Sequence, residues 1–292
     1  MDYAEGTLIG KRSFRLVYRA WLPEGEPKAV AVVVHGYSEH MGRYAHVVEA
    51  LVQRDYAVYG IDHRGHGGSQ GVRAHVERFD NFVEDLHLLV GKAKDAHHGL
   101  PVFMIGHSMG GLIATRYALR HQEELVGLVL SGAALHIGDE VSPLLKKLSA
   151  LISTLAPRIP IVPWAAGDES LLSRDPAVDE AVRADELCYK GKIRARMGHE
   201  LLKAANDARA RLAELTLPLL IMHGTADRLT NPQGSLQLYQ QARSTDKTLK
   251  LWQDCRHEIF NELDKAEVIA FAADWLDERV HRFAPEPATH PA

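Results

Sequence analysis

The stretch Gly106-His107-Ser108-Met109-Gly110 decides the fold of this chain. It follows an apolar run at 101–105 that indicates a strand, and it precedes a run at 111–119 that indicates a helix. A Gly-x-Ser-x-Gly pentapeptide between a strand and a helix is typical of a nucleophile elbow, a tight turn that exposes the serine oxygen at the edge of a sheet. The glycines leave room where chain approaches chain, and the helix N-terminus favours negative charge beside Ser108. The stretch therefore predicts a serine nucleophile.

Strand and helix patterns alternate on both sides of this turn. A β-hairpin is expected over 7–22 and further strands over 29–34, 56–61, 126–130, 218–224 and 248–252, with helices over 44–53, 82–96, 233–242 and 266–280. Such alternation predicts an α/β protein with a mostly parallel central sheet and helices on both faces.

The alternation stops between residues 131 and 215, where the sequence is helical and loop-like without a strong strand. We expect a helical cap over 134–215, inserted into a core formed by 1–133 and 216–283. The proline-rich end, 284–292, is expected to be a disordered tail.

An acidic residue and a histidine follow Ser108 in positions that suit a catalytic triad. Asp227 comes just after an expected strand, at the sheet edge where open α/β sheets bind ligands. His257 lies in the loop after the last expected strand. An imidazole can take the serine proton during attack, and a carboxylate holds that imidazole in the required tautomer. The order serine, acid, histidine along the chain is the order found in α/β-hydrolases.

Two backbone N–H groups are expected to stabilise the oxyanion that such an attack creates. In this fold one belongs to the residue after the nucleophile and one to the loop after the third strand. These positions are Met109 and Tyr37. Loss of one such donor typically costs about 3–4 kcal/mol of transition-state stabilisation.

Four segments carry a resemblance to a known family. They are His35 to Tyr44, Asp62 to Ser69, Gly106 to Gly111 and His223 to Arg228. In this order they resemble the oxyanion segment, the loop after the fourth strand, the nucleophile segment and the acid segment of monoacylglycerol lipases and their bacterial lysophospholipase-like relatives. The likeness runs from about residue 6 to about residue 280. The chain departs from it at Tyr37, where a small residue is common, and at Asp185-Glu186, where Asp-Pro is common.

The resemblance implies a serine esterase of the α/β-hydrolase superfamily that cleaves monoacylglycerols through an acyl-enzyme. Its triad would be Ser108, Asp227 and His257, with no metal and no organic cofactor. A carboxylesterase or lysophospholipase would use the same triad, as would a cofactor-free perhydrolase. A non-catalytic ligand-binding member is the alternative from a different class, and the complete triad disfavours it.

Substrate-binding residues are expected in two places. Glu39 and Arg43 lie four residues apart, so they either pair with each other or bind glycerol hydroxyls. A helix expected over 142–155 carries an apolar stripe that includes Leu148 and Ile152. This stripe either packs on the body as core or lines an acyl channel and touches lipid as a lid.

Four other residue sets have a simpler interpretation than catalysis. His63 and His66 have the spacing of metal ligands, but no further ligand accompanies them. Asp62 precedes Ser108, so we expect it to fix its loop rather than to act in the triad. His107 is expected to be a packed structural histidine, and Cys255 an inert buried thiol.

The composition fits one enzyme domain. The chain has 292 residues, of which 46% are hydrophobic and 25% charged, so it can bury a large core. A net charge of −4 gives no general attraction to nucleic acid, and no pattern sets an oligomeric state. Two distant cysteines, no signal peptide and no apolar run of about 20 residues predict a cytoplasmic protein, with peripheral membrane contact through the cap.

Overall fold

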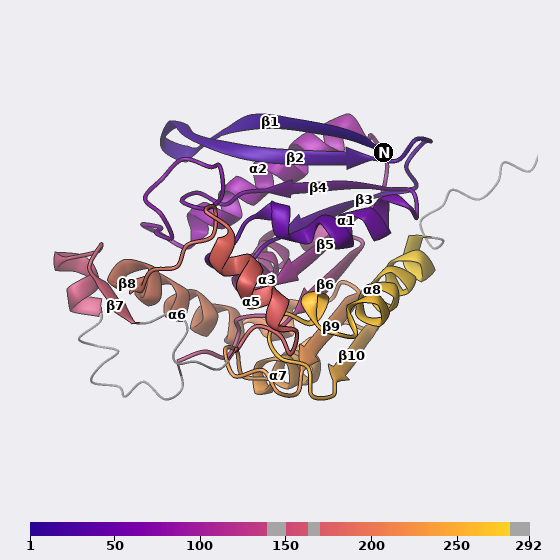
Figure 1. The fold of residues 1–292 in the computed structure, drawn as a ribbon. Helices are drawn as coiled ribbons and strands as arrows, with labels where there is room; N and C mark the ends of the chain where they lie inside the picture. Colours follow the sequence, from indigo (N-terminus) through magenta and orange to yellow (C-terminus); the bar gives the residue numbers. More distant parts are fainter. Residues whose placement is uncertain (139–149, 163–169, 281–292) are drawn as a thin grey trace, which may run out of the picture.

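An eight-stranded sheet forms the centre of the molecule, in the order β1-β2-β4-β3-β5-β6-β9-β10 (Figure 1). The structure is a computed structural model that describes residues 1–138, 150–162 and 170–280. The sheet strands are β1 (Asp2–Gly10), β2 (Phe14–Leu22), β3 (Ala29–Val34), β4 (Tyr56–Ile61), β5 (Val102–His107), β6 (Gly127–Ser131), β9 (Leu219–Gly224) and β10 (Lys247–Trp252). The β1–β2 and β2–β4 pairs are antiparallel, and all other neighbours are parallel.

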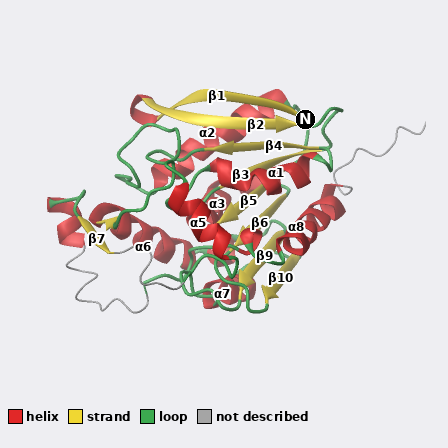
Figure 2. Ribbon diagram, in the orientation of Figure 1, coloured by secondary structure: helices red, strands yellow, loops and turns green. Residues whose placement is uncertain are grey.

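Helices cover both faces of this sheet (Figure 2). The helices of the described residues are α1 (Ala45–Val52), α2 (Asp80–Ala96), α3 (Met109–His121), α5 (Pro176–Ala184), α6 (Ala195–Arg209), α7 (Gln233–Gln241) and α8 (Lys265–Val280), of which α5 and α6 belong to the segment between β6 and β9. Alternate residues of β3 belong to the two cores: Val33 packs with residues of α1 and α8, and Val32 packs with residues of α2, α3, α6 and α7. Because both faces are covered, the inner parallel strands such as β3 and β4 are buried along their whole length, whereas the edge strand β10 contains polar as well as apolar residues. The predicted α/β class and mostly parallel sheet are confirmed.

The segment between β6 and β9 contains a small second sheet that the sequence did not predict. It pairs β7 (Pro160–Val162) with β8 (Ile193–Arg194) in antiparallel fashion. The sequence predicted no strong strand in this region, and both strands of this sheet are short. The strands have three and two residues, which is too short to leave a period-two pattern.

Of the cap elements, β7, β8 and α6 lie on the left in Figure 1 and α5 lies near the centre of the view; α6 contacts α3. Residues 150–155 of the expected helix 142–155 are helical. Within them Leu151 and Leu155 are 56% and 76% exposed, so this side of the stripe does not pack as core. Leu148, the rest of that helix and the expected tail at 284–292 lie outside the described residues.

The elbow joins β5 to α3 through a strained residue. Ser108 has φ +54° and ψ −120°, a backbone conformation that residues with a Cβ rarely adopt. A Cβ added to Gly110 would lie 2.1 Å from the Val34 carbonyl oxygen, and one added to Gly106 would lie 2.7 Å from the Gly110 carbonyl oxygen. Glycine is therefore required at both positions, because backbone atoms of β3 and α3 meet there.

None of the described helices has the length and apolar character that a bilayer crossing requires.

Candidate active site

Three side chains from three separate loops form one hydrogen-bonded chain. Ser108 follows β5, Asp227 lies just beyond β9, and His257 lies beyond β10. The Nε2 atom of His257 is 2.8 Å from the Ser108 Oγ, and its Nδ1 atom is 2.8 Å from the Asp227 Oδ2. The parallel strands place all three loops at the same edge of the sheet, as the sequence predicted. The arrangement can pass the serine proton to an imidazole that a carboxylate aligns.

Asp227 is held in place by more than His257. Its Oδ1 accepts the backbone N–H groups of Leu229 and Thr230 at 2.8 and 3.0 Å, and its Oδ2 accepts the Thr230 hydroxyl at 2.8 Å. The Nε2 atom of buried His223 lies 3.0 Å from the same Oδ2. Burial alone would raise the pKa of Asp227, but the neighbouring His257 and His223 outweigh it and hold that pKa far below its usual range. The carboxylate therefore stays ionised.

The Asp227 charge also affects the pKa of the His257 imidazole. Burial is the largest single effect and works to lower the pKa of His257, but the charge and hydrogen bond of Asp227, together with the charges of Glu258 and Glu39, outweigh it, so the net shift is upward from 6.5. The ring is also 4.8 Å from the ring of His107, centroid to centroid. The result is a base strong enough to accept the hydroxyl proton.

His223 and Thr230 were missed by the sequence reasoning. His223 ends β9 four residues before Asp227, and its Nδ1 is bonded to the Ser235 hydroxyl at 2.7 Å. The Thr230 hydroxyl is 3.0 Å from the Gly132 carbonyl oxygen. The signal was present as a buried polar residue at the end of an apolar strand, because such a residue needs hydrogen-bond partners.

The loop after β3 brings Tyr37 beside Ser108. Tyr37 and Met109 line the same cavity as Ser108, with Met109 as the first residue of α3. The Glu39 carboxylate fixes this loop from within, because its Oε1 accepts the Gly36 N–H at 2.5 Å and the Tyr44 hydroxyl at 2.7 Å. The His35–Gly36 peptide, which directly precedes the peptide that carries the Tyr37 N–H, is thus anchored by the buried Glu39 carboxylate.

Arg43 and Glu39 pair with each other, and Glu258 joins them. The Arg43 guanidinium donates to Glu39 Oε2 at 2.8 Å and to both Glu258 oxygens at 2.8 and 2.7 Å. All three side chains are largely buried. Burial raises the pKa of Glu39. For Glu258 burial is again the largest single effect, but the charge and hydrogen bonds of Arg43, with smaller contributions from His107 and Asn261, together outweigh it and the pKa is lowered. The loop that carries His257 is thereby tied to the loop that carries Tyr37.

Two hollows of different character meet at Ser108. A cavity of about 330 Å³ is mainly apolar. Its lining residues are Tyr37, Ser108, Met109, Ala134, Ile137, Gly138, Ile161, Ile193, Gly198, His199, Leu201, Leu202, Leu229, Thr230 and His257. Ile152, which the sequence suggested for this role, is half-buried and is not in this set.

The second hollow is much smaller, and most of the residues that line it are charged or polar. It measures about 10 Å³, room for roughly one water molecule. Glu39, Arg43 and Glu258 line it together with Ser108 and His257. An ester bound at Ser108 would thus have an apolar space on one side and charged groups on the other.

The residues that were expected to be structural occupy structural positions. Asp62 accepts N–H groups from Arg19, Met41 and Gly68 and so fixes its own loop. The Nδ1 atom of His107 lies 3.1 Å from the Ser131 carbonyl oxygen, and burial lowers the pKa of His107 to about 3, so this ring stays neutral.

The remaining candidates lie within packed surroundings. The His63 and His66 rings contact each other, the His35 ring and the Phe82 ring. Burial lowers their pKa values to about 3 and about 4, which keeps both rings uncharged. Cys255 is buried, and burial raises the pKa of its thiol to about 11.

Known proteins resemble this chain over almost its whole length. The family model described as serine aminopeptidase, S33 (Hydrolase_4) matches residues 25–264. The monoacylglycerol lipase of Mycolicibacterium smegmatis is 39% identical over 273 residues, which cover 94% of this chain and 96% of that protein. The monoglyceride lipase of Homo sapiens is 36% identical over 266 residues, 90% and 87% of the two chains. The crystal structure of Paleococcus ferrophilus monoacylglycerol lipase superposes with a TM-score of 0.79 at 26% identity and covers 96% of this chain and 100% of that one.

The raised pKa of His257 predicts the pH dependence of ester cleavage. A base must be deprotonated to act, so kcat/KM falls as the pH drops through the His257 pKa. Since the Asp227 charge shifts that pKa upward, the midpoint of the acidic limb is expected above pH 6.5. The measurement is kcat/KM for a water-soluble ester across the pH range, with circular dichroism at each pH to show that the fold is intact. A flat profile, or a midpoint below pH 6.5, would contradict this assignment.

Proposed function

The chain belongs to the serine aminopeptidase, S33 family of α/β-hydrolases, and we infer that it is a carboxylic ester hydrolase that cleaves monoacylglycerols into fatty acid and glycerol. One observation carries this inference: the chain Ser108–His257–Asp227 lies where a large apolar cavity and a small polar pocket meet. A monoacylglycerol has the same division, with an acyl chain on one side of its ester bond and glycerol hydroxyls on the other.

The first half of the proposed reaction transfers the acyl group to the enzyme. His257 takes the proton of Ser108 as the serine oxygen attacks the ester carbonyl. The negative charge that develops on the carbonyl oxygen is stabilised by the backbone N–H groups of Tyr37 and Met109. When the C–O bond breaks, the imidazolium gives its proton to the leaving glycerol oxygen. Asp227 stabilises the imidazolium while it exists.

The second half reverses the roles with water. His257 removes a proton from a water molecule, whose oxygen attacks the acyl carbonyl and forms a second oxyanion in the same place. Collapse breaks the bond to Ser108, which regains its proton from His257, and the fatty acid leaves. All of these steps use side chains and backbone groups of the chain itself.

The charged side chains of the small pocket favour a glycerol hydroxyl beside Ser108 over a phosphate headgroup. The guanidinium of the pocket, on Arg43, is already paired with the carboxylates of Glu39 and Glu258. An anionic phosphate would therefore meet two carboxylates that repel it, because the Arg43 charge is already neutralised. Neutral hydroxyls, in contrast, can donate hydrogen bonds to these carboxylates. This supports monoacylglycerols as substrates over lysophospholipids with the same triad.

The cap is proposed to touch lipid surfaces. Leu151, Leu155 and Ile159 are at least half exposed, and they lie within ten residues of one another. Exposed aliphatic side chains so close together are typical of a segment that contacts an apolar surface.

The nucleophile assignment is tested by Ser108→Ala. Removal of the Oγ is expected to lower monoacylglycerol hydrolysis by about 10⁶-fold, as in other serine triads, while the melting temperature stays close to the wild-type value. The measurement is glycerol release from a monoacylglycerol, with a matched lysophospholipid in parallel. Substantial turnover by the variant would remove Ser108 from this role, and faster cleavage of the lysophospholipid by the wild type would overturn the substrate assignment.

The acyl cavity is tested by Gly198→Leu on α6. A Cβ at Gly198 would meet Ile193 Cγ2 at an ordinary 3.5 Å, so a side chain can begin there without a clash, and because Gly198 lines the cavity the added atoms are expected to take up cavity space. We expect kcat/KM to fall roughly 10- to 100-fold for a long-chain monoacylglycerol and to change little for a short-chain one. Gly91→Leu is the matched control, because a Cβ at Gly91 on α2 meets nothing within 4 Å. Equal effects on both chain lengths would place the acyl group elsewhere.

A further inference from the structure

A short cap segment, residues 185–189, lies against the loop that carries Tyr37. The Tyr189 N–H donates to the Ser38 carbonyl oxygen at 2.8 Å, and the Ser38 hydroxyl donates back to the Tyr189 carbonyl oxygen. The rings of Tyr37 and Tyr189 meet edge to face, with centroids 6.5 Å apart. The cap and the oxyanion loop are thus joined by backbone and side-chain contacts next to the proposed donor.

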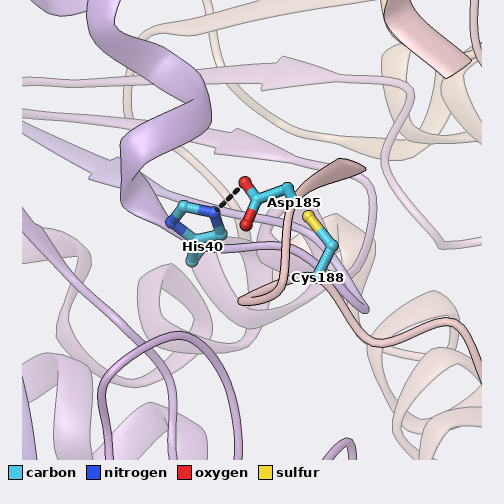
Figure 3. A group of neighbouring side chains, drawn as sticks. All are labelled: His40, Asp185 and Cys188. Atoms are coloured by element: carbon cyan, nitrogen blue, oxygen red, sulfur yellow. Dashed lines mark hydrogen bonds and ion pairs between the residues drawn. The ribbon is translucent and has the colours of Figure 1, made fainter. Parts of the chain in front are cut away.

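The strongest contact in this junction is the pair His40–Asp185 (Figure 3). His40 Nε2 lies 2.7 Å from Asp185 Oδ2, and His40 Nδ1 accepts the Gly42 N–H at 3.1 Å. Because Nδ1 accepts, the ring proton must be on Nε2, which donates it to the carboxylate. Asp185 Oδ1 accepts the Leu187 N–H at 2.8 Å. Both ring nitrogens of His40 and both carboxylate oxygens of Asp185 therefore have a hydrogen-bond partner.

The same arrangement disfavours a metal ion at this junction. His40, Asp185 and Cys188 are all metal-ligand types, with ligand atoms within 4.8 Å of one another (Figure 3). A metal on His40 Nε2 would force the ring proton onto Nδ1, where it would face the Gly42 N–H. Burial also raises the pKa of Cys188 to about 12, so the thiol is protonated at neutral pH. The cluster is a hydrogen-bonded clamp.

The loop that carries Tyr37 has a strained backbone, so contacts from outside the loop are required to hold its conformation. Ser38 has φ +75°, in the left-handed region that a residue with a Cβ adopts only at a free-energy cost. Glu39 anchors the loop from the inside through the Gly36 N–H, on the side of Tyr37 that precedes it. The contacts from 185–189 act on Ser38 and His40, on the side that follows. Tyr37 is thereby held between an internal anchor and an external one.

We propose that Asp185 is a positioning residue for the oxyanion hole. Through its hydrogen bond with His40, Asp185 keeps the Tyr37 N–H aimed at the developing oxyanion. This proposal rests on the proposed function of the same site. On this proposal, the contacts of cap residues 185–189 with the loop that carries Tyr37 affect the rate of the chemical step.

The test compares Asp185→Ala with Asp175→Ala. Asp175 caps the N-terminus of α5, where it accepts the Ala177 N–H, so its loss loosens the same part of the cap. With a water-soluble short-chain ester, Asp185→Ala is expected to lower kcat about 10- to 100-fold, because the oxyanion donor is misaligned rather than lost, with KM within about twofold. Asp175→Ala is expected to leave kcat within about twofold of wild type.

A second readout separates positioning from stability. An alkylboronic acid forms a tetrahedral adduct on a nucleophilic serine and resembles the intermediate, so its Ki is expected to rise with Asp185→Ala by about the factor that kcat falls. If that variant does not fold, Asp185→Asn, which retains one acceptor oxygen, is expected to show a smaller change in the same direction. Unchanged kcat and Ki in the Asp185 variants, or an equal loss in Asp175→Ala, would overturn the proposal. An active Ser108→Ala would instead overturn the proposed function.

Discussion

The hydrogen-bonded chain from Asp227 through His257 to Ser108 is the interaction on which the site depends. A serine hydroxyl is a weak nucleophile at neutral pH, so its proton needs an acceptor at hydrogen-bond distance. The charge of Asp227 makes the imidazole a better base and fixes which ring nitrogen faces Ser108. That charge persists because backbone N–H groups, a hydroxyl and His223 surround it. Most of the polar groups at this edge of the sheet serve that alignment.

The loops around the triad are held by buried charge rather than by packing alone. Arg43 joins Glu39, in the oxyanion loop, to Glu258, next to His257. Breaking such a buried pair by removing one partner typically destabilises a protein by about 3–5 kcal/mol, because the other charge is left unmatched. A network of this kind gives the oxyanion loop and the histidine loop one fixed relative position. The hydrogen bonds of cap residues Tyr189 and Asp185 with Ser38 and His40 further restrict the position of the loop that carries Tyr37.

Local sequence patterns predicted the fold and the triad because both depend on strand ends. Parallel strands bring their carboxyl ends to one edge, so Ser108, Asp227 and His257 could be placed together from the strand pattern alone. Arg43 and Glu258 could not be paired this way, because 215 residues separate them and only tertiary packing brings them together. The β7–β8 pair was missed because two or three residues carry no period. The large apolar cavity beside Ser108 is lined by α6 and the loop after β6, and Ile152, which the sequence suggested for a substrate channel, is not among its lining residues.

The central claim is that Ser108 is made reactive by an imidazole that Asp227 keeps aligned. The most direct test is covalent labelling with a fluorophosphonate, followed by peptide mass spectrometry, in the wild type and in His257→Ala. The account predicts a single adduct on Ser108 in the wild type and a labelling rate lower by several orders of magnitude in the variant. An adduct on another residue, or equal labelling rates in the two proteins, would contradict it.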